Sequence, residues 1–258
     1  MGANIAEVMK IIDNLHMIWN KPSRDRRGHV VTTARLISYI LCFGLVPLSF
    51  CYAENEVYFT LSEQAPDLVG ELSFTTTVYE DTLSDLARAY DQGYTEMRLA
   101  NPGVDPWLPG EDSEVLVPSL YVLPNAPRNG IVVNTPEMRM YVFKTSQSSP
   151  DLLQVTTYPI SIGRQNWSTP SGVMKIVAKA KDPAWYPPES IRKEHAEEGD
   201  DLPRIVPPGP DNPLGRHAIR LSLAGYLIHG TNKPYGIGMR VTHGCIRMYP
   251  KDIEVIFR

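Results

Sequence analysis

The feature that most constrains the fold is a change of hydrophobic period near residue 128. Before it, apolar residues recur at the three- and four-residue spacing of an amphipathic helix: Leu83, Leu86, Ala87 and Tyr90. After it, short apolar segments follow one another, separated by turn signals such as Asn129-Gly130 and Pro207-Pro-Gly-Pro210. The chain therefore divides into a small mixed part and a larger, mostly β part.

The small part has the pattern of a strand, two helices and a second strand. Phe74–Val78 is rich in threonine and predicts a strand. Asp81 or Thr82 is placed to cap the helix that carries the apolar stripe. A second helix is expected over Tyr94–Ala100, ended by Asn101-Pro-Gly103, and Val115–Pro118 closes the unit as a strand.

The larger part predicts a series of strands and one long loop. The expected strands are Ile131–Val133, Met138–Phe143, Tyr158–Ile162, Val173–Val177, Ala218–Leu221 and Tyr226–His229. Pro183–Asn212 is polar and rich in proline, and loops of this length in compact domains usually serve a function, here a lid on the substrate side. Asp252–Phe257 predicts a final short helix.

Residues 1–53 have the pattern of an export signal. Five basic residues between Lys21 and Arg35 precede the apolar run Leu36–Cys51, and small residues at Cys51 and Ala53 suit a signal peptidase. An uncleaved anchor is the alternative, although Gly44 and Pro47 interrupt the run. A lipoprotein site at Cys51 is disfavoured by the bulky Phe50, and translation starting at Met17 is a further alternative.

Charge and cysteine content then narrow the function. Residues 1–53 hold six of the 25 Lys and Arg and three of the 29 Asp and Glu, so residues 54–258 carry 19 against 26. This acidic balance argues against nucleic acid or an anionic membrane as a partner. Export would also leave Cys245 as the only cysteine, because Cys42 and Cys51 lie in the signal segment. A single thiol in an oxidising compartment is either buried and inert or reactive.

The neighbours of Cys245 favour the reactive alternative. His229 follows an apolar strand, and a histidine within hydrogen-bond reach of a thiol supplies the base for its attack on a carbonyl. Gly236 and Gly238 allow the intervening loop to fold back. Gly244 lets successive backbone N–H groups converge as an oxyanion hole, and Arg247 suits a substrate carboxylate.

These residues resemble the catalytic motif of the L,D-transpeptidase family. The matching residues are His229-Gly230 and Thr242-His-Gly-Cys-Ile-Arg247, with Thr242 in place of the more frequent serine. Gly163 with Thr169–Gly172, and Pro207–Gly215 near the substrate cleft, also look like segments of that family. Asp81-Thr-Leu83 and Ala100-Asn-Pro102 resemble a glycan-binding LysM module, although Glu80 stands where a glycine is usual.

The resemblance covers roughly residues 72–258 and implies an architecture. A signal peptide (1–53) and a lead-in (54–71) precede an α+β LysM-like module (72–122), a proline-rich linker (123–128) and the catalytic domain (129–258). The catalytic domain is expected to be mostly β, with a β-sandwich-like fold. Because the family continues beyond the final helix, the resemblance also implies that a C-terminal strand is missing.

The resemblance further implies a two-step acyl transfer on peptidoglycan stem peptides in the periplasm, without metal or cofactor. Cys245 is expected to attack the diaminopimelate–D-Ala bond, with His229 as general base oriented by the carbonyl of Gly230. The oxyanion is assigned to the N–H groups of His243, Gly244 and Cys245. Substrate binding is assigned to the following residues: Arg247, Thr242, Tyr235 and Asn232. The acceptor is a lipoprotein lysine, slightly favoured, or a second diaminopimelate, and carbapenems are expected inhibitors.

Three alternatives stay open at this point. Water could resolve the thioester, which would make the protein a carboxypeptidase-type hydrolase on the same scaffold. A catalytically impaired protein that only binds the cell wall is a second alternative. A zinc site is the third, formed by His217, His229, His243 and Cys245, but their spacing lacks the short-range ligand pairs typical of zinc motifs.

Overall fold

The computed structural model describes residues 57–61, 67–146, 149 and 151–258. The predicted signal segment, with Cys42 and Cys51, lies outside the described residues. Glu54–Arg258 groups as a unit of its own. Within the described ranges, no helix has both the length and the apolar character needed to cross a membrane.

The small N-terminal part contains the predicted succession of elements. β3 (Ser73–Thr76) is followed by α2 (Leu83–Ala89), α3 (Tyr94–Ala100) and β4 (Glu114–Val117), and β3 pairs with β4 in antiparallel fashion. Thr82 caps α2, since its Oγ1 accepts from the backbone N–H of Asp85 at 3.1 Å. The stripe faces inward, and the buried cluster of this part contains Leu83, Leu86, Ala87, Met97 and Val115.

Two further strands come from residues that were expected to be only a lead-in. β1 (Phe59–Leu61) pairs with a strand of the large sheet, and β2 (Leu68–Gly70) pairs with β5 (Leu120–Val122). Each has three residues, which is too short for an alternating pattern to be recognised in the sequence. Their partners, distant along the chain, are what make them strands.

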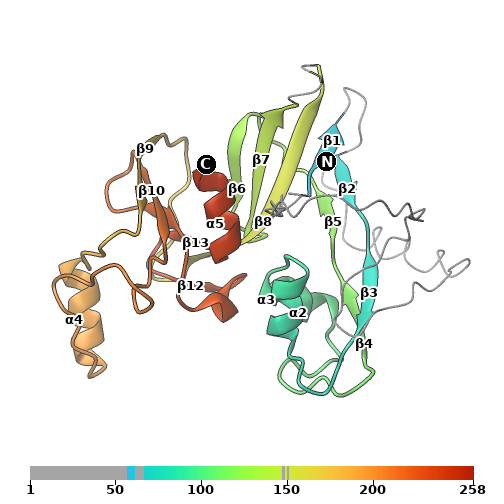
Figure 1. Cartoon of the computed structure of the whole chain (residues 1–258), viewed down its shortest axis with the longest axis horizontal. Coiled ribbons are helices and arrows are strands. Elements are labelled where there is room, and N and C mark those ends of the chain that lie inside the picture. Colours follow the sequence, from blue (N-terminus) through green and yellow to red (C-terminus); the bar gives the residue numbers. More distant parts are fainter. Residues whose placement is uncertain (1–56, 62–66, 147–148, 150) are drawn as a thin grey trace, which may run out of the picture. The chain divides into compact units, whose positions relative to one another are not determined.

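The strands of the larger part belong, together with β1, to one nine-stranded sheet, which confirms the mostly β prediction (Figure 1). Its strands run in the order β6 (Gly130–Asn134), β7 (Arg139–Thr145), β8 (Leu153–Gly163), β13 (Ile246–Met248), β11 (Leu227–His229), β10 (His217–Leu221) and β9 (Ile176–Lys181). β1 and β12 (Arg240–Thr242) also pair with β8. The long β8 thus pairs with strands of both halves and joins them in a single sheet.

One predicted strand is misplaced. The expected segment Val173–Val177 overlaps only the start of β9, which begins at Ile176. Val173 is fully exposed, and the preceding Gly172 has a φ of +123°, so the chain is still in a turn there. The apolar side chain of Val173 therefore contributed a strand signal at a position where no strand partner exists.

Both faces of β7 are buried, and they face different clusters. Met140 and Val142 belong to the main core, on which Ile253 of α5 (Pro250–Phe257) also packs (Figure 1). Tyr141 and Phe143 belong to a second cluster on the opposite face. Since alternate residues of a strand share a face, Arg139 lies on the same face as Tyr141 and Phe143.

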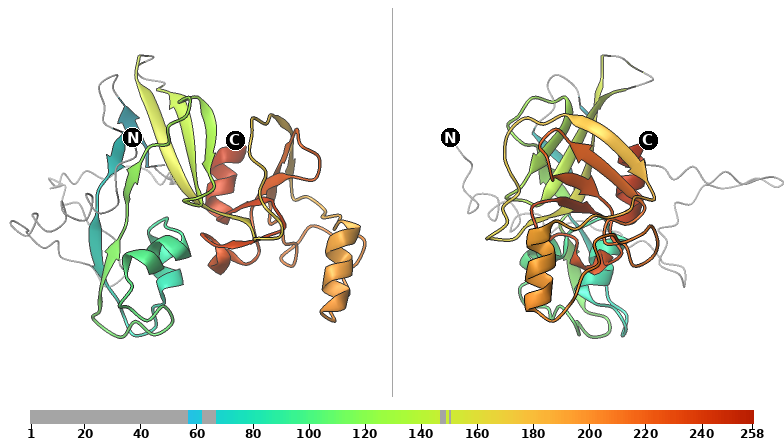
Figure 2. Two further views of the ribbon diagram at one scale, coloured as in Figure 1. Left: turned by 180° about the vertical axis from the view of Figure 1, so that it is seen from behind. Right: turned by 90° about the vertical axis from the view of Figure 1, so that its left-hand side faces the viewer.

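The predicted long loop between β9 and β10 contains a helix. α4 (Glu189–Glu197) occupies its middle (orange in Figure 2). Only Ile191 of this helix is buried, so the sequence has no apolar stripe from which the helix could have been predicted. Asn212 organises the rest of the loop, because its Nδ2 donates to the carbonyls of Pro183, Val206 and Pro207.

Candidate active site

Strand register brings the predicted histidine and cysteine onto one face of the sheet. β11 and β13 are parallel neighbours in which Ile228 is opposite Ile246 and His229 is opposite Arg247. Ile228 and Ile246 both point into the main core. The other face therefore carries His229, Arg247 and Cys245, which directly precedes Ile246.

The turn before the cysteine is stabilised by its own threonine. The hydroxyl of Thr242 donates to the carbonyl of Cys245 at 2.6 Å and accepts from the N–H of Gly244 at 3.2 Å. Thr242 is buried and its hydroxyl is engaged inside the turn, whereas it was predicted to bind substrate. Gly244 also differs from its predicted part in the oxyanion hole, because its N–H is already used. The amides of His243 and Cys245 remain as candidate donors.

Gly244 is required by both conformation and space. Its φ is +101°, and a Cβ there would approach Cε1 of Tyr226 to 2.8 Å. Tyr226 therefore covers the turn, a contact that no sequence pattern indicated. Thr169 holds the turn from another side, since its hydroxyl donates to the carbonyl of Gly244 and accepts from the N–H of Gly163, both at 2.9 Å. The upstream segment thus lies directly against the cysteine turn.

Cys245 is a half-buried thiol. Its Sγ lies 3.7 Å from the carbonyl oxygen of Gly225, to which the S–H can donate. Burial raises the pKa of Cys245 above its ordinary value, although a hydrogen bond from the backbone of Leu227 and the charge of Arg247 act in the opposite direction. At neutral pH the cysteine is consequently a thiol that needs a base.

His229 is buried and neutral. Its Nδ1 lies 2.7 Å from the carbonyl oxygen of Gly230. A carbonyl can only accept, so Nδ1 carries the proton and Nε2 is left as an acceptor. Burial and the nearby charge of Arg247 lower the pKa of His229 to about 4, against smaller raising effects from the carbonyls of Gly230 and Leu214. The ring is therefore in the form that can take a proton at neutral pH.

Arg247 is a half-buried cation, and no hydrogen bond or ion pair joins its side chain to another described residue. Its Nε is buried without a partner. The guanidinium reaches toward Gly236, where a Cβ would stand 3.9 Å from Nη1 of Arg247. Burial lowers the pKa of Arg247, and the neighbouring Cys245 partly offsets this. Leaving a buried cation without a counter-charge is costly, which is the situation expected where a ligand supplies that charge.

Tyr235 and Asn232 lie on the segment that joins His229 to Cys245. Tyr235 is in the 3₁₀ turn η1 (Pro234–Gly236), and the side chains of both residues are exposed. The backbone of η1 is the part that approaches Arg247, through Gly236. Of the predicted substrate residues, Tyr235 and Asn232 are thus exposed on the rim of the site, whereas Arg247 is half-buried.

An acidic residue of α4 also contacts the cysteine turn and was not found from the sequence. Glu194 forms an ion pair with Arg164, and its Oε2 lies 3.1 Å from Nε2 of His243. Trp167 packs edge-on against the His243 ring at 5.1 Å. Burial lowers the pKa of His243, and Glu194 partly restores it. Glu194 could not be predicted because α4 lacks periodicity and lies far from His243 along the chain.

The described residues contain no group of three or more His, Cys, Asp or Glu side chains arranged to hold a metal ion. His217, one of the ligands considered for zinc, packs instead against Phe257 with ring centroids 4.7 Å apart. The zinc alternative therefore has no ligand set in this part of the chain.

Known proteins match both the site and its surroundings. The YkuD family, described as the L,D-transpeptidase catalytic domain, matches residues 128–258. The probable L,D-transpeptidase YcfS of Escherichia coli is 43% identical over 74% of this chain, and the match spans 59% of the length of YcfS. ErfK/SrfK of the same organism, also a probable L,D-transpeptidase, is 39% identical over 86% of this chain and 70% of its own.

A solved L,D-transpeptidase from Mycobacterium smegmatis aligns with 78% of this chain and 86% of its own, at 17% identity and a TM-score of 0.34. That similarity is too low for the two folds to be compared in detail. The assignment to a family rests on the family match and the sequence relatives. The region matched by the family includes the histidine strand, the cysteine turn and the sheet that joins them. This chain belongs to the L,D-transpeptidase family.

Proposed function

We propose that this chain is a peptidoglycan L,D-transpeptidase in which Cys245 is the nucleophile and His229 the general base. The observation that supports it best is the shared face of β11 and β13, which holds a thiol, a neutral imidazole and an unpaired guanidinium. Membership of the family supports the reaction type.

The first step would transfer the acyl group of the donor stem to the enzyme. As Sγ of Cys245 attacks the carbonyl carbon between diaminopimelate and D-Ala, Nε2 of His229 takes the thiol proton. The C–N bond then breaks, His229 returns the proton to the leaving D-Ala amine, and a thioester remains. The amides of His243 and Cys245 would stabilise the oxyanion, and Arg247 would bind a carboxylate of the stem.

The second step would release the acyl group to an amine. A lysine of an outer-membrane lipoprotein or the amine of a second diaminopimelate attacks the thioester, loses a proton and forms the new amide, and Sγ recovers a proton. We favour the lipoprotein lysine slightly. Tyr235 and Asn232, exposed on the rim, would contact the stem or the acceptor.

The proposed setting is the periplasm, reached through cleavage of residues 1–53 as a signal peptide. Residues 54–71, which include β1 and β2, would precede a LysM-like module of residues 72–122, joined by residues 123–128 to the catalytic domain of residues 129–258. The exposed side chains of Tyr79 and Trp107 are available on the module for contact with the cell wall. Whether that module holds glycan is a separate question from the chemistry at Cys245.

Covalent trapping tests the nucleophile. We expect a carbapenem to add its mass to the folded protein, with the adduct on the peptide that contains Cys245. Cys245→Ala should remain unmodified at an unchanged unfolding temperature. A folded wild-type protein that gains no mass would refute Cys245 as the nucleophile.

A second assay identifies the acceptor. Disaccharide-tetrapeptide is incubated with the protein and either a lysine-terminated peptide or free stem peptide, and the products are weighed by mass spectrometry. We expect amide-linked products that are lost in His229→Ala. Free tripeptide as the only product would contradict the transferase proposal and identify a hydrolase.

A further inference from the structure

The segment between His229 and Cys245, residues 230–244 and here called the connector, is held on one side by the catalytic sheet. The hydroxyl of Ser161 donates to the carbonyl of Gly236, and the N–H of Ile162 donates to the carbonyl of Met239 at 3.2 Å. β12, the last part of the connector, pairs with β8. These contacts involve one side of residues 235–238, and the opposite side is left for contacts with another part of the chain.

That opposite side is occupied by the two N-terminal helices. The N–H of Tyr94 donates to the carbonyl of Ile237 at 3.0 Å, and that of Thr95 donates to the carbonyl of Gly238 at 3.3 Å. The hydroxyl of Ser84 in α2 donates to the carbonyl of Tyr235 at 3.3 Å. Three carbonyls near the middle of the connector, those of residues 235, 237 and 238, are therefore satisfied by the N-terminal part of the chain.

The contact is close enough to require glycine on both sides. A Cβ on Gly238 would come within 2.3 Å of the Cα of Gly93, and a Cβ on Gly93 within 2.8 Å of the Cα of Gly238. Gly238 also has a φ of +83°, in the region that favours glycine. Backbone approach of this kind fixes the distance between α3 and the connector.

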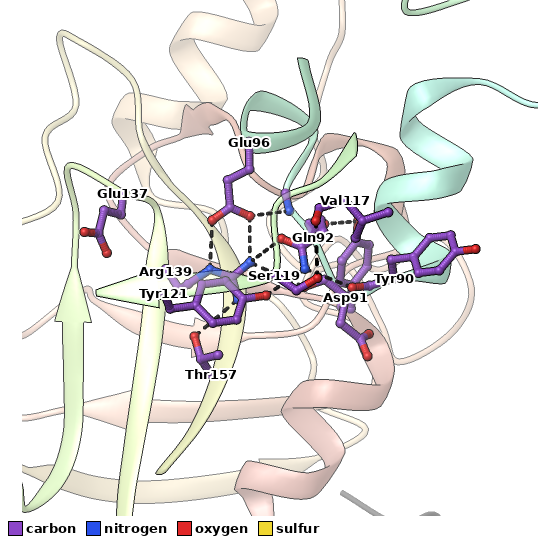
Figure 3. Close-up of polar contacts among 12 residues, drawn as sticks. Tyr90, Asp91, Gln92, Glu96, Val117, Ser119, Tyr121, Glu137, Arg139 and Thr157 are labelled. Atoms are coloured by element: carbon purple, nitrogen blue, oxygen red, sulfur yellow. Dashed lines mark hydrogen bonds and ion pairs between the residues drawn. The ribbon is translucent and has the colours of Figure 1, made fainter. Parts of the chain in front are cut away.

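A buried ion pair holds α3 in register with the sheet (Figure 3). Glu96 of α3 accepts from Nε of Arg139 at 2.8 Å and from Nη2 at 2.7 Å, a bidentate pair. The same carboxylate accepts from the N–H of Gly93 at 2.7 Å, which caps α3. One side chain thus joins the start of α3, where the connector is bound, to strand β7.

The other nitrogen of the Arg139 guanidinium and its face also have partners. Its Nη2 donates to the Oε1 of Gln92 and its Nη1 to the Oγ1 of Thr157, both at 3.2 Å, and its guanidinium lies 4.2 Å from the ring centroid of Tyr121 (Figure 3). Arg139 is 1% exposed. A buried guanidinium bound in this way tolerates little displacement of its partners, because any lost bond leaves charge unsatisfied.

The connector in turn bounds the space of Arg247. Nη1 of Arg247 is near Gly236, since a Cβ added there would stand 3.9 Å from it, and Gly236 lies between the carbonyls that Ser84 and Tyr94 bind. A shift of residues 235–238 would move the wall beside the guanidinium and would move Tyr235 on the rim. A shift of α3 would therefore reach the site through the connector, without any change in the position of the other strands of the sheet.

From this geometry we infer that the N-terminal helices position the connector for catalysis, with the backbone amides of Tyr94 and Thr95 as the positioning groups. This inference rests on the proposed function, since it assigns α3 a part in donor binding through Arg247 and the rim. It gives the N-terminal part of the chain a role in the reaction itself, independent of any contact with glycan.

A proline substitution tests one positioning bond by itself. Tyr94 is the first residue of α3, where proline is tolerated, and Gly93 has φ −86° and ψ 149°, which suits a residue before proline. Tyr94→Pro removes the N–H that binds Ile237 and places a ring carbon there. Tyr94→Ala is the matched control, because it also loses the side chain that packs against Trp107 but keeps the N–H.

We expect Tyr94→Pro to raise KM for the tetrapeptide donor about tenfold relative to Tyr94→Ala, with kcat changed less than about twofold. Alkylation of Cys245 by iodoacetamide should be equal in the two variants, since the thiol does not need the rim. Equal KM values in the two folded variants would overturn the inference. So would a fall in the alkylation rate of Tyr94→Pro as large as its loss of donor binding, which would indicate a general structural role.

Hydrogen–deuterium exchange provides a readout that does not need activity. Peptides from residues 230–242 should exchange faster in Tyr94→Pro than in Tyr94→Ala, while peptides from β7 and β8 should be unchanged. If the wild-type protein forms no acyl adduct yet exchange rises only in Tyr94→Pro, the proposed function fails and the mechanical link stands. Unchanged exchange in the connector would refute the link, whatever the activity.

Discussion

One sheet of the protein contains a buried arginine, Arg139, and a half-buried arginine, Arg247, and their surroundings differ in charge. Arg139 on β7 is bound by a carboxylate, an amide, a hydroxyl and an aromatic face. Arg247 on β13 has a buried Nε without a partner. Burial opposes the charge in both cases, but Glu96 more than compensates for Arg139, whose pKa is raised, whereas the pKa of Arg247 is lowered.

The difference in partners indicates different roles: Arg139 stabilises the scaffold, and Arg247 belongs to the candidate site. A buried cation with a counter-charge and a hydrogen-bond partner at each nitrogen stabilises one arrangement of the elements that supply those partners, here α3 against β7. A partly buried cation without a counter-charge lowers the free energy of unfolding, and the rest of the fold offsets that loss. A ligand carboxylate would supply the missing counter-charge. Replacing residues in each region should therefore affect different measurements.

The largest effect is expected from the base on the face of Arg247. His229→Ala should lower the rate of acylation by about 10²–10⁴-fold at neutral pH, because the raised pKa of Cys245 leaves a thiol without a base. The rate is measured by mass spectrometry with a carbapenem, and circular dichroism checks the fold. A rate within tenfold of wild type would contradict the assignment of His229.

The pH profile of the wild type belongs to the same prediction. Because burial holds the pKa of His229 at about 4, acylation should stay independent of pH down to about 4–5, below the ordinary pKa of 6.5. The folded pKa lies below the unfolded one, so this group lowers the free energy of unfolding as pH falls from about 6.5 to about 4. An acid limb centred near 6.5 would mean that the ring is more solvated than it is here.

On the paired side, Arg139→Met should lower the free energy of unfolding by about 3 kcal/mol, because Glu96 then has a partly buried charge without its partner. The double variant Arg139→Met with Glu96→Gln should recover at least about 1 kcal/mol of that loss, since the stranded charge is removed. Urea unfolding of the three proteins measures both. A single variant as stable as wild type would break the comparison.

On the unpaired side, Arg247→Ala should change the free energy of unfolding by less than about 1 kcal/mol while lowering kcat/KM for the stem peptide about 100-fold. The rate of alkylation by a small thiol reagent should fall far less. Equal loss in the peptide and reagent assays would indicate that Arg247 supports the turn, and would remove the distinction between the two arginines.

The smallest effect concerns a buried acid in α5, Asp252. Burial, with the nearby charge of Asp91, raises the pKa of Asp252 to about 8, and its Oδ2 has no partner. The folded pKa exceeds the unfolded value of 3.8, so stability should fall as pH rises from about 4 to about 8. Asp252→Asn should raise the free energy of unfolding at pH 8 by at least about 1 kcal/mol and by less at pH 5. An equal gain at both pH values would exclude ionisation as the cause.

Much of the fold was predictable where the signal is local. The stripe from Leu83 to Tyr90 and the breaker after Ala100 located α2 and α3, because helix periods and caps are written within one or two turns. Strands of three residues such as β1, β12 and β13 were missed, since they exist only through their partners. α4 was missed because it buries a single residue.

The candidate site shows the same division. His229 and Cys245 were found because the motif that contains them is continuous in the sequence, and the contact of Nδ1 of His229 with the carbonyl of Gly230 is local. Glu194, Tyr226 and Asn212 were not found, because each acts across a long separation. The N–H of Gly244 was expected in the oxyanion hole, but the side chain of Thr242 competes for it.

The sequence by itself determined the order of elements, the residues of the catalytic motif and the acidic balance of residues 54–258, all of which depend on residue type and near spacing. The motif pointed to Arg247 as a group for a substrate carboxylate, but no local pattern showed which arginine would be neutralised by the fold, since each stands between apolar neighbours in a short strand pattern. Only the tertiary structure decided that Glu96, 43 residues away, would neutralise one and that none of the described residues would neutralise the other. The physical reason is that a buried charge is settled by long-range contacts, which the local pattern of a strand does not encode.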